Sequence, residues 1–156
     1  MQDCAVTALP LILLVDPEPD AVFELQSAVA ERAISHVCCD FVTARHLLAE
    51  LTPQLLVANA RLEAYNGLHL VYIAKGHQLP TRCVIYSRHE DWFLVHEVQS
   101  AGAFFESESR LKYKIAGYLT SRLPAVDRRN PFAHDRRGHP RGGRRPSDEP
   151  RPLLAG

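Results

Sequence analysis

The chain has 156 residues, of which 46 % are hydrophobic and 23 % charged, a balance typical of soluble globular proteins and enough for one domain with additional segments. Lys and Arg balance Asp and Glu at 18 each, but residues 1–123 hold 10 basic and 14 acidic side chains, and residues 124–156 hold 8 and 4. The apolar run over 9–15 is too short to cross a membrane and has no basic residue before it, which argues against a span or a signal peptide. We therefore expect a cytoplasmic protein.

The first two elements follow from hydrophobic spacing. Residues 11–15 (LILLV) form a continuous, branched apolar run, which predicts a strand covered on both faces. The two prolines of DPEPD end this strand, and Asp20 can cap a helix that starts after them. Residues 21–33 then predict a helix whose buried face consists of Val22, Leu25, Val29 and Ala33.

The later elements alternate in the same way. Thr43 is the expected N-cap of the second helix, and Asn66–Gly67 marks a turn. We predict strands over 36–41, 55–58, 81–87 and 102–107, and helices over 44–51, 68–75, 89–101 and 110–123. Leu111, Ile115, Tyr118 and Leu119 give the last helix its apolar side.

This alternation predicts an α/β fold with one five-stranded parallel sheet, doubly wound, in a flavodoxin-like three-layer (βα)5 sandwich. Such sheets carry their functional groups at the carboxyl ends of the strands. In this chain those ends place Asp16, Asn59 and Ser87 together.

The four cysteines, Cys4, Cys38, Cys39 and Cys83, form no CxxC pair and have no zinc spacing. Adjacent residues of a strand point to opposite faces, so Cys38 and Cys39 make a poor disulfide. We interpret all four as small buried hydrophobes in a reducing compartment.

The composition changes after Pro124. Residues 125–156 are rich in Arg, Pro and Gly and hold one aromatic residue, so they predict a disordered tail beyond a domain over 9–122. Its Arg pairs could bind nucleic acid through phosphates, but acids are mixed in and the excess charge is small, so solvated disorder is favoured. His134 and His139 lack partners for a metal site.

The segments LILLVDPEPD, QLLVANARLEAYNGL, RCVIYS and AGAFF resemble the receiver domain of two-component response regulators (CheY-like) over residues 9–122. The resemblance implies a phosphorylation site of five residues. Two adjacent acids hold Mg²⁺, an Asp after the third strand accepts the phosphoryl group, a Ser or Thr after the fourth strand bonds it, and a Lys after the fifth pairs with it.

Three of these five residues differ here. Asp16 matches the first acid, Pro17 stands in place of the second, and Glu18 is displaced by one residue, so its carboxylate should point elsewhere. Asn59 stands at the acceptor position, and Ser87 matches the hydroxyl residue.

The Lys of the fifth strand is absent, because FESES occupies this segment and Lys112 comes about three residues too late, while Arg88 follows Ser87 in place of a small residue. An amide is a feeble nucleophile, and Mg²⁺ is normally held by carboxylates. We therefore expect no catalysis, no phosphorylation, no cofactor and lost or weak Mg²⁺ binding. A turn or capping role is favoured for Asp16 over that of a weak metal ligand.

The resemblance predicts a stand-alone pseudo-receiver in two-component or phosphorelay signalling, which acts through phosphorylation-independent protein–protein interaction. Asn59 either locks one of the two arrangements of a receiver or only satisfies local hydrogen bonds. Trp92, Phe93 and Val95 are the candidate docking face, because a helix on a sheet cannot bury four consecutive apolar residues, 92–95. Partial burial under the last helix is the alternative, and homodimerisation is left open.

Three other functions stay open at this point. The chain could be a receiver gated by another input, such as a small ligand or a metal at Asp16. It could also be a nucleic-acid-associated protein that uses the Arg-rich tail. A flavodoxin-like enzyme ranks last, because no Gly-rich phosphate loop follows the first strand.

Overall fold

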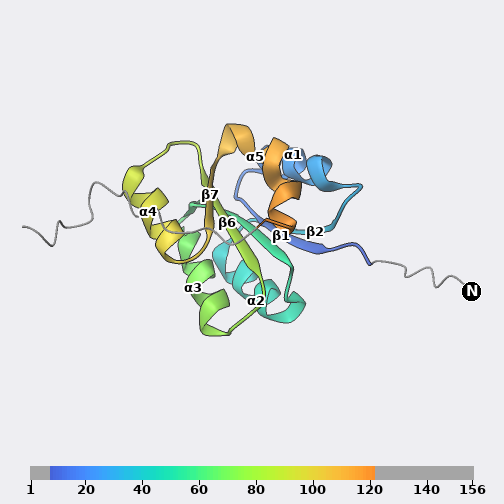
Figure 1. The fold of residues 1–156 in the computed structure, drawn as a ribbon, viewed down its shortest axis with the longest axis horizontal. Coiled ribbons are helices and arrows are strands. Elements are labelled where there is room, and N and C mark those ends of the chain that lie inside the picture. Colours follow the sequence, from blue (N-terminus) through green and yellow to red (C-terminus); the bar gives the residue numbers. More distant parts are fainter. Residues whose placement is uncertain (1–7, 122–156) are drawn as a thin grey trace, which may run out of the picture. The chain divides into compact units, whose positions relative to one another are not determined.

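The computed structural model describes residues 8–121. It contains strands β1 (Leu11–Val15), β2 (Ile34–Cys38), β3 (Leu55–Asn59), β6 (Arg82–Ser87) and β7 (Phe104–Ser107). They form one parallel sheet in the order β2-β1-β3-β6-β7. Helices α1 (Pro19–Val29), α2 (Phe41–Leu51), α3 (Leu68–Gly76), α4 (Trp92–Ser100) and α5 (Glu108–Lys114) cover it (Figure 1). The predicted doubly wound α/β fold is confirmed.

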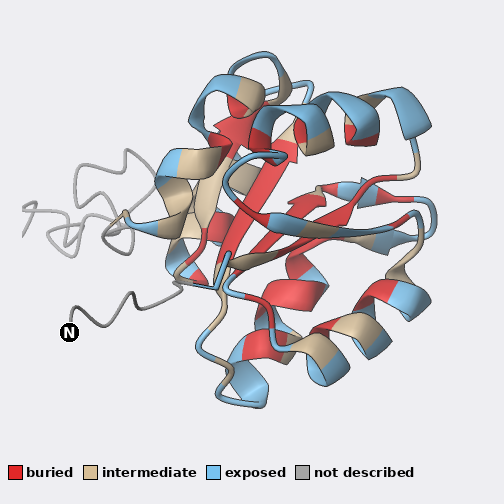
Figure 2. Ribbon diagram, turned by 90° about the vertical axis from the view of Figure 1, so that its right-hand side faces the viewer, coloured by how far each residue is buried: buried red, intermediate tan, exposed pale blue. Residues whose placement is uncertain are grey.

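Two apolar cores lie on the two faces of the sheet. Successive side chains of a strand alternate between faces, so in β1 Leu13 and Val15 join one core while Ile12 and Leu14 join the other. The first core packs under α2, α3 and α4, and the second under α1 and α5. Figure 2 shows the buried residues gathered in the strands and on the inner sides of the helices.

Several predicted boundaries are wrong for local reasons. Helix α1 ends at Val29, short of Ala33, which is buried after the helix instead. Strand β2 is Ile34–Cys38 rather than 36–41, because Asp40 leaves the strand to cap α2. Its Oδ1 accepts from the backbone N–H of Thr43 at 2.8 Å, so Asp40, and not Thr43, is the N-cap.

The fourth and fifth helices are also shorter than the spacing predicted. Helix α4 begins at Trp92 rather than at residue 89, because the Asp91 side chain accepts from the backbone N–H of Phe93 at 3.0 Å and caps it. Helix α5 gives way after Lys114 to a 3₁₀ helix, η1 (Ile115–Leu119). The predicted apolar side of this segment is confirmed, since Leu111 and Ile115 are fully buried in the core.

An antiparallel hairpin of β4 (Arg61–Leu62) and β5 (Tyr65–Asn66) follows β3, and the sequence did not reveal it. The ring of Tyr65 stacks on Phe41 of α2 with centroids 4.6 Å apart. At Gly67 a Cβ atom would lie 2.2 Å from the Asn59 carbonyl oxygen, so only glycine lets the chain return this close to β3. The predicted Asn66–Gly67 turn therefore has a steric reason.

The cysteines divide between core and surface. Burial raises the pKa of the Cys38 and Cys83 thiols to about 12, so both stay protonated and unreactive, as expected of buried hydrophobes. Cys39 is exposed, and the expectation of burial is wrong there, because it stands beyond the end of edge strand β2. Cys4 lies outside the described residues, as do the predicted tail over 125–156 and the Arg pairs for which solvated disorder was favoured over nucleic-acid binding. No helix over residues 8–121 is long and apolar enough to cross a membrane.

Candidate functional site at the strand tips

The parallel strands bring the predicted site residues together at one edge of the sheet. Asp16 follows β1, Asn59 ends β3 and Ser87 ends β6. All three line one hollow of about 270 Å³, and Glu18 lines it as well. Convergence of Asp16, Asn59 and Ser87 follows from strand order alone, because β1, β3 and β6 are neighbours.

Asp16 is buried at this site, with 2 % of its surface exposed. Its Oδ1 accepts from the backbone N–H of Glu18 at 2.7 Å, in the turn that the Pro17 segment predicts. Its Oδ2 accepts from Asn59 Nδ2 at 2.9 Å and from the hydroxyl of Tyr86. Hydrogen-bond donors therefore meet both oxygens of this buried carboxylate.

The amide of Asn59 is oriented by two contacts. Its Nδ2 donates to Asp16, and its Oδ1 accepts from the backbone N–H of Arg61 at 2.9 Å. If the amide were flipped, its oxygen would face the Asp16 carboxylate and its NH₂ group would face the backbone N–H of Arg61. Both contacts therefore favour the orientation in which Nδ2 faces Asp16. A carboxylate at this position could accept from Arg61 but could not donate to Asp16.

Tyr86 also belongs to the site, although it was not predicted from the sequence. It lies one residue before Ser87 in β6, is 1 % exposed and donates its hydroxyl to Asp16. Burial, followed by the hydrogen bond to Asp16, raises the pKa of the phenol well above its usual range, so it remains a donor. The available signal was the rule that a buried tyrosine needs a partner for its hydroxyl.

A second buried carboxylate, Glu106, lies in β7 near the position where a receiver has its Lys. It is 4 % exposed and accepts from the Tyr118 hydroxyl at 2.7 Å and the Ser107 backbone N–H at 3.0 Å. Arg110 Nε and Lys114 Nζ lie 3.2 and 3.1 Å from its oxygens. Burial raises the pKa of Glu106, but the bonds from Tyr118 and Lys114 outweigh it, and the net pKa is lowered.

The other predicted residues make local contacts. Ser87 Oγ accepts from the backbone N–H of His89 at 3.3 Å. Glu18 is exposed and meets Asp16 through its backbone rather than its carboxylate. Arg88 Nε pairs with Glu108 Oε2 at 3.0 Å. Within residues 8–121 there is no group of three or more His, Cys, Asp or Glu side chains arranged to hold a metal ion.

The candidate docking residues lie on α4. Trp92 is 45 % exposed and Phe93 is 64 % exposed, whereas Val95 is half-buried. Val98 is fully buried and Leu94 packs against the same core, so the stripe through Leu94 and Val98 is the inner side of the helix. Exposure of two large aromatic side chains agrees with the prediction that α4 cannot bury all of residues 92–95.

No family model matches the sequence, and no curated protein matches it. Solved structures do match the fold. The signal receiver domain of a LuxO repressor protein from Vibrio parahaemolyticus has a TM-score of 0.65 at 21 % identity, over 71 % of this chain and 90 % of that one. The receiver domain of the response regulator NarL from Mycobacterium tuberculosis has a TM-score of 0.65 at 18 % identity, over 70 % and 92 %.

A LuxR-family two-component response regulator from an Aurantimonas species also has a TM-score of 0.65, at 21 % identity, over 77 % of this chain and 91 % of that one. At sequence identities this low, the similarity concerns the fold alone. The chain has the fold of response-regulator receiver domains.

Proposed function

We propose that this protein is a pseudo-receiver, a signalling module that acts by binding another protein without phosphorylation or catalysis. The contact of Asn59 Nδ2 with Asp16 at 2.9 Å carries the proposal. A phosphoacceptor must be a nucleophile, and this amide has no available lone pair on nitrogen. Its oxygen already accepts from Arg61.

The contacts of Asp16 also argue against a magnesium site. Mg²⁺ takes near-octahedral oxygen ligands and is normally bound through carboxylates. Here Glu18, Asn59 and Tyr86 point N–H and O–H groups at the Asp16 carboxylate, and this is the polarity that would repel a cation. The amide of Asn59 instead joins the tips of β1 and β3 directly, and this bridge takes the place of a shared metal.

An incoming phosphoryl group would also lack a fixed cation at the tip of β7. The strand ends at Ser107, and the nearby cations Arg110 and Lys114 are paired with Glu106. Arg88 is likewise paired with Glu108. Stabilisation of transferring phosphoryl groups depends on preorganised cations, so this further difference supports the same proposal.

Incubation with acetyl phosphate and Mg²⁺ tests the proposal. We expect the intact mass to stay that of the unmodified chain, because no carboxylate stands at position 59 to form an acyl phosphate. A receiver that has the acceptor Asp, treated in parallel, shows that the reagent is active. A stable gain of one phosphoryl mass that persists in the Ser87→Ala variant would contradict the proposal.

The proposed contact surface is the exposed side of α4, defined by Trp92, Phe93 and Val95. Large aromatic side chains at a surface are frequent binding hot spots. The proposed partner is a signalling protein, and a second copy of the chain is one candidate.

Phe93→Ala is expected to weaken partner binding at least about tenfold, as loss of a hot-spot aromatic does. Binding is measured with the immobilised full chain and partner recovered from the source cells. Phe23→Ala is the matched control, because Phe23 is 70 % exposed on α1 at the other face of the sheet. Equal binding by both variants and wild type would remove α4 from the proposal.

A further inference from the structure

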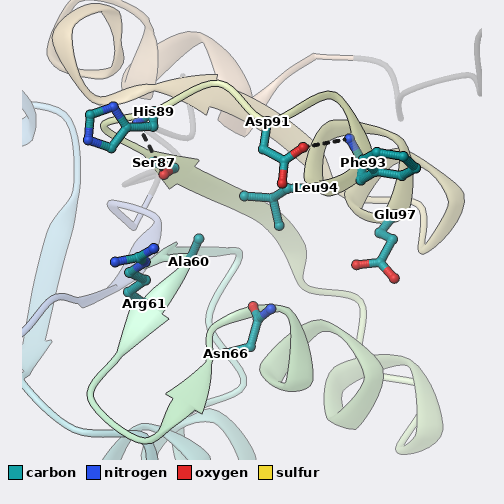
Figure 3. A pocket seen from close by; sticks show the side chains of 9 residues that line it. All are labelled: Ala60, Arg61, Asn66, Ser87, His89, Asp91, Phe93, Leu94 and Glu97. Atoms are coloured by element: carbon teal, nitrogen blue, oxygen red, sulfur yellow. Dashed lines mark hydrogen bonds between the residues drawn. The ribbon is translucent and has the colours of Figure 1, made fainter.

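The pocket beside helix α4 extends the strand-tip hollow. It has a volume of about 290 Å³, and Arg61, Ser87 and His89 line both this pocket and the hollow (Figure 3). Neither cavity is lined by a residue of β2, which forms one edge of the sheet. The free edge of β2 is therefore a separate feature of the surface.

The backbone of β2 has unused hydrogen-bonding groups along this edge. The N–H of Ile34 donates at 2.9 Å, and the carbonyl oxygen of Cys38 accepts at 3.2 Å, to and from the chain at the two ends of β1. Alternate residues of a strand direct their N–H and C=O groups to the same side, so His36 also faces β1, whereas Ser35 and Val37 face outward. Over residues 8–121, no hydrogen bond engages the backbone N–H or C=O of Ser35 or Val37.

The side chains along this edge are uncharged and partly apolar. Ile34 is 52 % exposed and Val37 is 40 % exposed, and the two lie on opposite faces of the sheet. Residues 33–39 contain no Asp, Glu, Lys, Arg or Pro. Soluble proteins usually protect an edge strand with charges, prolines or a bulge, so this edge is able to pair with another strand.

The opposite edge of the sheet differs. Strand β7 has four residues, and one of them is the buried Glu106, which pairs with Arg110 and Lys114. A short strand with charged side chains around it discourages a further strand from pairing. Over residues 8–121 the sheet therefore has one unprotected edge, and pairing of two copies through it would leave no such edge free.

The charges of the domain suit pairing of β2 with itself. Residues 1–123 hold 14 acidic and 10 basic side chains, so two copies of the domain repel each other where their charged surfaces meet. Strand β2 carries no Asp, Glu, Lys or Arg, so an antiparallel pair of β2 strands places no like charges opposite each other.

We propose that β2 binds β2 of a second copy of this chain, antiparallel, about a two-fold axis at His36. In this register Ser35 of one copy lies opposite Val37 of the other, so outward-facing residues meet. They exchange both N–H···O=C bonds, as hydrogen-bonded pairs of an antiparallel ladder do. Ile34 lies opposite Cys38, so each exposed apolar side chain of the edge gains a neighbour from the other copy.

The proposed dimer would leave helix α4 free. This helix packs against β7, at the edge of the sheet away from β2. A dimer would therefore present the contact surface of α4 twice, which strengthens binding to a partner that has two matching sites. This consequence rests on the proposed function, whereas formation of the dimer does not.

Sedimentation or light scattering of the full chain at micromolar concentrations measures its mass in solution. We expect a concentration-dependent dimer. Ser35→Pro should raise the dimer dissociation constant at least about tenfold, because proline removes an outward N–H of the ladder from each copy. Ser35→Ala is the matched control: both variants lose the hydroxyl that accepts from Gln26 Nε2 at 3.3 Å, but the Ala variant keeps the N–H and should dimerise like wild type.

Exchange of charge at His36 tests the axis, because a residue on a two-fold axis meets its own copy. His36→Lys and His36→Glu each place like charges opposite each other, so each should raise the dissociation constant at least about tenfold. A mixture of the two variants should dimerise again, because opposite charges then meet. His77→Lys and His77→Glu, at the exposed C-cap of α3, are the controls and should behave like wild type. The measurements are made at about pH 8, where an imidazole side chain is ordinarily neutral.

A wild-type chain that stays monomeric throughout overturns the proposal. So does a dimer that persists in both His36 variants, or a mixture of these variants that stays monomeric. If circular dichroism shows that Ser35→Pro is unfolded, the His36 variants decide, because His36 is exposed and its replacement leaves the core intact. If Ser35→Pro is folded and still dimerises like wild type, the proposal is likewise overturned.

Phe93→Ala distinguishes this interface from the surface of α4. We expect this variant to dimerise like wild type, whereas a dimer that only Phe93→Ala disrupts would lie at α4 and would contradict pairing through β2. None of these masses decides the pseudo-receiver proposal, which is judged by the mass of the chain after acetyl phosphate treatment.

Discussion

Replacement of Glu106 by Gln is expected to lower the free energy of unfolding by about 2–3 kcal/mol at pH 7, because charged hydrogen bonds are lost inside the domain. Glu106 is 4 % exposed and accepts from Tyr118 and Ser107 while it pairs with Arg110 and Lys114. A Gln side chain keeps the shape but places an NH₂ group against donors. The two cations are about half exposed, so water compensates them in part, which keeps the expected cost moderate.

The effect of this substitution should depend on pH in a defined direction. The pKa of Glu106 in the folded state is below its ordinary value of 4.5. A carboxyl with a depressed folded pKa stabilises the protein above its unfolded pKa, and this stabilisation is lost as the pH falls through the folded pKa. The difference in the free energy of unfolding between wild type and Glu106→Gln should therefore have its largest value at pH 7 and become smaller below pH 4.5.

Urea unfolding of both proteins at several pH values measures this difference. Glu108→Gln is the matched control, because among residues 8–121 Glu108 pairs with the exposed Arg88 alone, and its loss should cost at most about 1 kcal/mol. A Glu106→Gln variant that unfolds like the control at pH 7 would mean that the buried carboxylate contributes nothing beyond a surface ion pair. A difference that stays constant to low pH would contradict its depressed pKa.

The features predicted well from sequence are those that local patterns determine. Strands β1, β3 and β6 occur within one residue of the predicted ranges, because continuous apolar runs are needed in strands that helices cover on both sides. The convergence of Asp16, Asn59 and Ser87 followed from the geometry of parallel sheets. No contact between individual side chains was needed for that prediction.

The missed features depend on contacts between distant parts of the chain. Tyr86 is 70 residues from Asp16, so its hydrogen bond has no local signature, and its ring looks like one more apolar residue of the strand. The segment that holds Glu106 was noted only for its missing Lys, because the sequence does not show that Tyr118 and Lys114 return to this carboxylate. The hairpin was missed because its two-residue strands carry too little periodicity.

Asn59→Asp is expected to destabilise the domain by about 2–4 kcal/mol at pH 7 in the absence of divalent cations, because it brings two carboxylates into contact. The substitution removes the donor that meets Asp16 at 2.9 Å and leaves the acceptor that Arg61 uses. Asn66→Asp is the matched control. The Asn66 Oδ1 accepts from the backbone N–H of Leu68 at 2.9 Å, which a carboxylate can do as well, so this variant should remain close to wild type.

Thermal unfolding with and without Mg²⁺ then separates the two roles of residue 59. In Asn59→Asp the new carboxylate and Asp16 supply hard anionic ligands, so Mg²⁺ should raise the melting temperature of the variant and leave wild type and Asn66→Asp unchanged. Lower pH should also restore the variant, because two adjacent carboxyl groups can share one proton. If Mg²⁺ stabilised wild type as strongly, the amide could not be the substitute for the cation, and the pseudo-receiver proposal would lose the contact that carries it.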